Sequence, residues 1–105
     1  MRVFIIGDTE NVNSIENFER AEDALHNENQ RDVINPAKIE AMFPASIQEY
    51  EKAEIMLALL SICDSVYLMQ NWRKCKIAYM LVGFARGRQM KVVELQTGVE
   101  MKREA

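Results

Sequence analysis

An aromatic ring, an amide and three cations stand close together in one stretch of this sequence, at Asn71, Trp72, Arg73, Lys74 and Lys76. An indole can stack on a nucleobase, which contributes roughly 1–3 kcal/mol per base. Cations at the start of a helix oppose the helix dipole, so they favour a site where an anion lies between them and the helix. The stretch therefore predicts a site for a nucleotide-like small molecule. The alternative is an ordinary one: a loop aromatic that closes the sheet edge, beside a solvated face of Lys and Arg.

A second loop adds polar groups but no clear catalytic pair. Gly7, Asp8, Thr9 and Glu10 follow a strand-like run. Backbone amides and the Thr9 hydroxyl can contact a phosphate, whereas the two carboxylates would repel one and suit ribose hydroxyls or a base edge better. We rank Glu94, at the end of a later strand-like run, above Asp8 and Glu10 as a weak catalytic candidate. An ordinary turn explains the residues of this loop equally well.

These loops are positioned by strands that alternate with helices. Apolar runs typical of buried strands occur at residues 3–6, 33–34, 66–69 and 92–95. The alternation implies right-handed crossovers, so we expect an α/β fold with a mostly parallel sheet of four or five strands and helices on both faces. Both polar loops then follow strand ends at the carboxyl edge of the sheet, where open α/β folds bind ligands.

Capping patterns mark where three helices begin. They lie at Asn13 with Glu16, at Asn35 with Pro36, and at Ser46 with Glu49. The second helix is expected to run through Phe43 and the third through about Ile62. Within the third helix the run from Ile55 to Leu60 is apolar on every face, which indicates burial on more than one side. We therefore expect a subunit interface and a homodimer or larger homo-oligomer.

Composition limits the class of protein. The 105 residues fit one domain, 1–105, with 49% apolar and 28% charged residues and a net charge of −3. That charge argues against binding a nucleic-acid polymer or an anionic membrane.

No apolar run is long enough to span a bilayer or to form a signal peptide, so we expect a cytoplasmic protein with Cys63 and Cys75 reduced. With His26 as the single histidine, we expect no metal and no cofactor. The charged tail 98–105 is either a last edge strand or disordered.

Several short motifs, taken in order and spacing, resemble the nucleoside 2-deoxyribosyltransferase-like superfamily, and most closely its small branch common in phages and bacteria. They are residues 1–7, residues 18–25, residues 33–36, residues 63–68, Trp72 and Ala78. The resemblance covers residues 1 to about 95. It implies a flavodoxin-like three-layer sandwich, assembly into homodimers or larger oligomers, and cleavage or exchange of the N-glycosidic bond of nucleosides or their monophosphates.

The sequence departs from that family at the residues that carry its chemistry. The resemblance places the nucleophilic glutamate of the enzymes at Leu81 and the assisting aspartate at Met56. It places the small residues of the phosphate loop at Cys75 and Ile77, and the proline after the first glycine at Asp8. Carboxylates are needed because an oxocarbenium-like centre must be captured or stabilised.

The first hypothesis is therefore a non-catalytic nucleotide-binding protein on a deoxyribosyltransferase-like scaffold. If the chain is phage-encoded, it would act in the host cytoplasm and sequester a nucleotide immune signal. The second hypothesis is an enzyme, a nucleoside or nucleotide N-glycosidase or deoxyribosyltransferase that uses non-standard carboxylates. The third is an interaction module whose pocket is vestigial.

Overall fold

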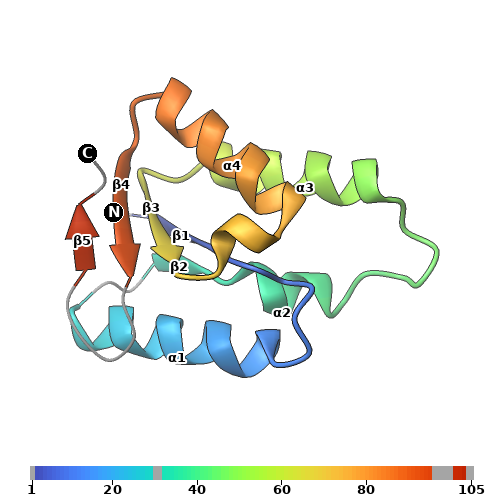
Figure 1. Ribbon diagram of the computed structural model, residues 1–105, viewed down its shortest axis with the longest axis horizontal. Coiled ribbons are helices and arrows are strands. Elements are labelled where there is room, and N and C mark those ends of the chain that lie inside the picture. Colours follow the sequence, from blue (N-terminus) through green and yellow to red (C-terminus); the bar gives the residue numbers. More distant parts are fainter. Residues whose placement is uncertain (1, 30–31, 96–100, 104–105) are drawn as a thin grey trace.

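The computed structural model describes residues 2–29, 32–95 and 101–103, with the backbone alone for residues 93–95 and 101–103. Ten elements follow one another along the chain (Figure 1): β1 Arg2–Ile6, α1 Ser14–Asn27, β2 Asp32–Ile34, α2 Pro36–Glu40, α3 Glu49–Ser61, β3 Ser65–Met69, the 3₁₀ turn η1 Trp72–Lys74, α4 Lys76–Gly87, β4 Lys91–Leu95 and β5 Met101–Arg103. All four strands expected from the apolar runs are present, and each begins one residue earlier than predicted.

The strands form one sheet in the order β2-β1-β3-β4-β5. The first four strands are parallel, and β5 pairs antiparallel with β4 at the edge. This is the strand order of the flavodoxin-like α/β sandwich, so the predicted fold class is confirmed. The charged tail was expected to be either a last edge strand or disordered. Residues 101–103 of this tail form the edge strand β5.

Alternation along β1 divides the core into two layers. Val3 and Ile5 point to the face covered by α1, where Phe18 and Leu25 pack against them. Phe4 and Ile6 point to the opposite face, which α3 and α4 cover. Figure 1 shows α1 on one side of the sheet and the pair α3 and α4 on the other. Burial of β1 from both sides explains why its sequence is continuously apolar.

The side chain of Asn35 fixes the start of α2, as predicted. Its Oδ1 accepts hydrogen bonds from the backbone N–H of Ala37 (3.0 Å) and of Lys38 (3.4 Å), and Pro36 occupies the first helical position. Its Nδ2 donates to Glu22 Oε1 of α1 (3.1 Å), which also lies 3.3 Å from Lys38 Nζ. The same residue therefore caps α2 and holds it against α1. The helix ends at Glu40 rather than Phe43, and hydrogen-bonded turns follow.

The two predicted capping boxes do not form as expected. Asn13 is the N-cap of α1, but its φ of −100° and ψ of 19° are not extended, and its side chain makes no capping hydrogen bond. The segment from Pro44 to Ile47 closes as a turn, so Ser46 cannot begin a helix. Gln48 is the N-cap of α3 instead, and its backbone N–H donates to Glu51 Oε1 at 2.8 Å.

Within the described residues, no helix has both the length and the apolar character needed to cross a bilayer.

The two asparagine caps provide a matched pair of variants. Asn35→Ala should lower the free energy of unfolding by about 1 kcal/mol or more, because it removes a cap and a contact to a half-buried carboxylate. Asn13→Ala should change it by less than about 0.5 kcal/mol, because no side-chain cap is lost. Urea unfolding followed by circular dichroism measures both. Equal losses in the two variants would contradict the role assigned to Asn35.

Candidate functional site

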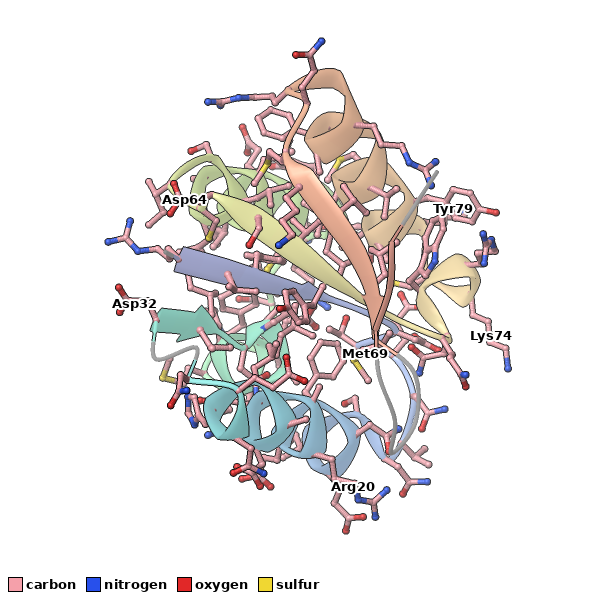
Figure 2. The ribbon with its side chains drawn as sticks, turned by 90° about the vertical axis from the view of Figure 1, so that its left-hand side faces the viewer. Arg20, Asp32, Asp64, Met69, Lys74 and Tyr79 are labelled. Atoms are coloured by element: carbon pink, nitrogen blue, oxygen red, sulfur yellow. The ribbon has the colours of Figure 1, made fainter. Side chains whose placement is uncertain are left out.

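The carboxyl ends of β1 and β3 meet where the strand order reverses, which is the usual ligand edge of an open α/β sheet. The loops after these two strands are joined, because the Asp8 backbone N–H donates to Asn71 Oδ1 at 3.1 Å. Figure 2 shows Met69 and Lys74 at this end of the sheet, and Asp32 and Asp64 at the other. The two polar loops singled out in the sequence are therefore neighbours in space.

A small cavity lies at this edge, next to β1. The space that it offers to a bound molecule is about 10 Å³, roughly enough for one water molecule. The lining comes from β1, its loop, α2, α3 and the start of α4, namely Ile5, Ile6, Gly7, Thr9, Pro36, Glu40, Met56, Cys75, Ile77, Ala78 and Leu81. Pockets for small ligands usually measure about 300–1,000 Å³. The cavity in this conformation is thus far too small for a nucleotide, and binding one would require the surrounding segments to move apart.

Gly7 is required where β1 turns into the cavity. A Cβ atom added to it would lie 2.6 Å from Met69 Sδ and 3.0 Å from Phe18 Cζ. The Met69 sulfur can move, but the Phe18 ring is buried against β1 and has little room. The backbone at Gly7 therefore passes close to these two side chains at the cavity wall.

Glu40 is the polar residue of the cavity that the sequence did not reveal. The Thr9 hydroxyl donates to Glu40 Oε2 at 2.7 Å, and both residues line the cavity. Glu40 is the last residue of α2, which follows β2, the strand next to β1. The signal available in advance was the Asn35-Pro36 helix start, which places this short helix at the ligand edge.

Apolar residues occupy the wall where the resemblance places carboxylates. Met56 of α3 and Leu81 of α4 are 1% and 3% exposed, and both line the cavity. Cys75 and Ile77, where the resemblance places the phosphate loop, line it as well. The fold thus brings Met56 of α3 to the same cavity as the other three positions, which lie at or in α4, and none of the four is an acidic or basic residue.

Trp72 does not present an open ring to a base in this structure. It is 2% exposed, Arg73 Cζ lies 4.6 Å from its ring centroid, and the Tyr79 ring lies 5.0 Å away at 57°. Its Nε1 is buried with no hydrogen-bond partner. A base would have to displace Arg73 or Tyr79 to reach the indole. In this structure Trp72 anchors η1 into the core beneath α4.

The predicted cations surround the start of α4. Arg73 and Lys74 are exposed on η1, and Lys76 is exposed as the first residue of α4. The first turn of α4 contains no acidic residue, and the side chain of its N-cap, Cys75, makes no capping hydrogen bond. The positive end of the helix dipole is thus reinforced by lysine at a wall of the cavity, which favours an anion there.

Asp8 and Glu10, two of the weak catalytic candidates, are not among the residues that line the cavity. Asp8, Glu10 and Cys75 have potential metal-ligand atoms within 4.8 Å of one another. Asp8 Oδ1 already accepts the Glu10 backbone N–H at 2.9 Å, and the Glu10 side chain is exposed. The backbone of Glu94 pairs with Leu68 of β3, and its side chain lies outside the described residues.

The Cys63 thiol lies before β3, at the opposite edge of the sheet. Burial raises the pKa of this thiol from 9.0 to about 11, with Arg2 opposing the rise and Asp64 adding to it. Its Sγ donates to the Leu59 carbonyl at 3.4 Å. Because the thiolate is the reactive form, Cys63 is a poor nucleophile at neutral pH.

Comparison with known proteins gives one family. Residues 1–94 match the family described as Domain of unknown function (DUF4406). No curated protein matches the chain, and no solved structure does.

The raised pKa of Cys63 predicts a pH dependence of stability. The folded thiol keeps its proton up to about pH 11, whereas the unfolded thiol loses it above about pH 9. The folded state then binds more protons in this window, so the free energy of unfolding falls as pH rises through it. Cys63→Ser should lose less stability than the wild type over the same window, as measured by urea unfolding at several pH values. Parallel pH curves for the two proteins would show that the thiol does not titrate as described.

Proposed function

The chain belongs to the DUF4406 family, and we propose that it is a non-catalytic nucleotide-binding protein on a scaffold like that of the nucleoside 2-deoxyribosyltransferases. One observation carries the proposal. Met56 and Leu81, at the positions where the resemblance places the two catalytic carboxylates, wall the same cavity at the ligand edge. The scaffold thus keeps the place of the site and replaces its charged wall by an apolar one.

The chemistry of N-glycosidic cleavage explains why this replacement favours binding over turnover. The transition state carries positive charge on the sugar, and a carboxylate must stabilise it or form a covalent bond to its anomeric carbon. A thioether and an isobutyl group offer neither an anion nor a nucleophile of comparable strength. A sugar held against Met56 and Leu81 would therefore meet only van der Waals contacts.

The anionic end of the ligand belongs at the start of α4. Backbone N–H groups of the first helical turn, the dipole and the side chains of Lys74 and Lys76 would together attract a phosphate. Cys75, Ile77 and Ala78 of the same turn line the cavity, so a phosphate bound there lies next to the remaining space.

Hydrogen-bonding groups for the sugar end lie in the cavity lining, at Thr9 and Glu40. The Thr9 hydroxyl and the Glu40 carboxylate lie within 2.7 Å of each other and line the cavity. A carboxylate accepts hydrogen bonds from ribose hydroxyls and repels phosphate, which fixes the direction of the ligand. Phosphate near α4 and hydroxyls near α2 is the orientation that the charges favour.

Entry of a nucleotide requires the loop after β1 to move. Two hydrogen bonds hold it, one from Asp8 to Asn71 and one from Thr9 to Glu40. Each contributes about 1 kcal/mol net, so a ligand that replaces them with its own hydrogen bonds can open the loop at modest cost. A stoichiometric binder of this kind, acting as a homo-oligomer, would sequester a nucleotide signal without destroying it.

Titration calorimetry tests the anion end of the site against a panel of nucleoside mono- and diphosphates, cyclic nucleotides and ADP-ribose. Lys74→Ala/Lys76→Ala should raise the Kd of the best ligand at least about ten-fold, because two cations near the phosphate are lost. Arg73 is left in place because it stacks on Trp72. The matched control is Arg20→Ala/Lys52→Ala, which removes the same charge from α1 and α3. Absence of heat with every compound would reject the proposal and favour an interaction module.

The Glu40 carboxylate in the cavity favours one competing function, an N-glycosidase. Chromatography of deoxynucleoside monophosphates incubated with the protein would then show free base, and Glu40→Gln would abolish the release. We expect no base above the level of a protein-free control. Release that depends on Glu40 would establish an enzyme and overturn the binding-only proposal.

A further inference from the structure

Three potential metal ligands from two loops meet at the carboxyl edge of the sheet. A carboxylate oxygen of Asp8, a carboxylate oxygen of Glu10 and the Sγ of Cys75 all lie within 4.8 Å of one another. Asp8 and Glu10 follow β1, whereas Cys75 is the N-cap of α4 and comes much later in the sequence. Two carboxylates and a thiolate form a donor set that a divalent metal ion can use.

Backbone hydrogen bonds hold the two loops in this arrangement. The Asp8 N–H donates to Asn71 Oδ1 at 3.1 Å, which joins one loop to the other. Asp8 Oδ1 accepts the Glu10 N–H at 2.9 Å. The Cys75 N–H donates to the Trp72 carbonyl at 3.3 Å, at the end of η1. The fold therefore fixes the backbone that carries all three groups.

The thiol of Cys75 is buried without a hydrogen-bond partner. The residue is 2% exposed, and its side chain does not cap α4. Within the described part of the chain, this Sγ pairs with no N–H or carbonyl group. The sulfur instead faces the carboxylates of Asp8 and Glu10, because it lies within 4.8 Å of both. A buried donor atom in that position is arranged to ligate an ion.

The two carboxylates have no counter-charge. Asp8 is 8% exposed, and no cationic side chain among the described residues forms a salt bridge with Asp8 or Glu10. Two carboxylates at this separation repel each other, and burial of an unpaired carboxylate costs free energy. A divalent cation bound between them would offset both effects.

We propose that Asp8, Glu10 and Cys75 bind one zinc ion, with a water molecule in the fourth position. Thiolate favours zinc over Mg²⁺ and Ca²⁺, which prefer oxygen ligands. Each of the three side chains forms one bond to the metal, and the thiol proton leaves to solvent. The cavity that Cys75 lines offers about 10 Å³, which is enough for the water. The site does not depend on nucleotide binding, because the ion needs only these side chains and water.

The ligand atoms must move slightly to close on the ion. Around a tetrahedral zinc they lie about 3.3–3.5 Å apart, so the present separations shrink by roughly an ångström. The Glu10 side chain is exposed and makes no described hydrogen bond, so rotation about its own bonds supplies that movement. The expectation of no metal depended on the single histidine, whereas these ligands are carboxylates and a thiol that only the fold brings together.

Cobalt(II) titration of the reduced, full-length protein tests the thiolate ligand. Cobalt takes the place of zinc and, when bound to thiolate, shows a sulfur-to-cobalt absorption band in the near ultraviolet. We expect this band to saturate at a single cobalt ion per chain and to disappear when zinc is added. Cys75→Ser should abolish the band, whereas Cys63→Ser, which changes the thiol at the opposite edge of the sheet, should keep it. No band in the wild type, or a band that depends on Cys63, would overturn the proposal.

Two further variants test the carboxylates and do not disturb the buried thiol. Asp8→Asn keeps the oxygen that accepts the Glu10 N–H, and Glu10→Gln changes an exposed side chain, so both should fold, as circular dichroism checks. Each should raise the cobalt Kd at least about ten-fold, because an anionic ligand is lost. Glu28→Gln, at the exposed C-cap of α1, removes the same charge elsewhere and is the matched control. An unchanged Kd in both Asp8→Asn and Glu10→Gln would rule out this site.

Discussion

Burial of β1 on both faces is the constraint from which the rest of the molecule follows. Four consecutive residues, Val3 to Ile6, are at most 1% exposed. A strand of this kind must lie inside the sheet with a helix layer above and below it. The chain then has to cross from one face to the other, and the reversal of strand order next to β1 leaves a crevice at the carboxyl edge. The packing of β1 between the two helix layers therefore determines where the cavity lies.

Features that depend on neighbouring residues could be predicted from the sequence. Apolar runs predict the strands, and Asn35-Pro36 predicts the start of α2, because strand burial and proline geometry are local properties. The start of α3 was predicted wrongly. Ser46 and Glu49 have the residue types and spacing of a capping box, but the backbone there forms the turn from Pro44 to Ile47 instead. The sequence motif alone cannot show whether the capping box or the turn forms at these residues.

Features that depend on segments far apart could be predicted only in part. The loops after β1 and β3 were expected at one edge, and they are joined there by Asp8 and Asn71. The Asn35-Pro36 helix start could have placed Glu40 at this edge, but nothing near Glu40 in the sequence shows that Thr9 lies 2.7 Å away. The sequence left open whether Trp72 stacks on a base or closes the sheet edge, and in the structure Tyr79 and Arg73 cover its ring. The exposed fraction of a side chain depends on how the sheet and helix layers pack around it. The residue type alone does not determine it.

The burial of Trp72 has a practical consequence. It is the only tryptophan of the sequence, it is 2% exposed, and it sits in η1 between the loop that meets Asp8 and the first turn of α4. Its fluorescence therefore comes from a single indole shielded from water, with a guanidinium on one side. The molecule carries its own optical reporter at the ligand edge, and any rearrangement of η1 that admits water to that indole would move its emission toward longer wavelengths without an added label.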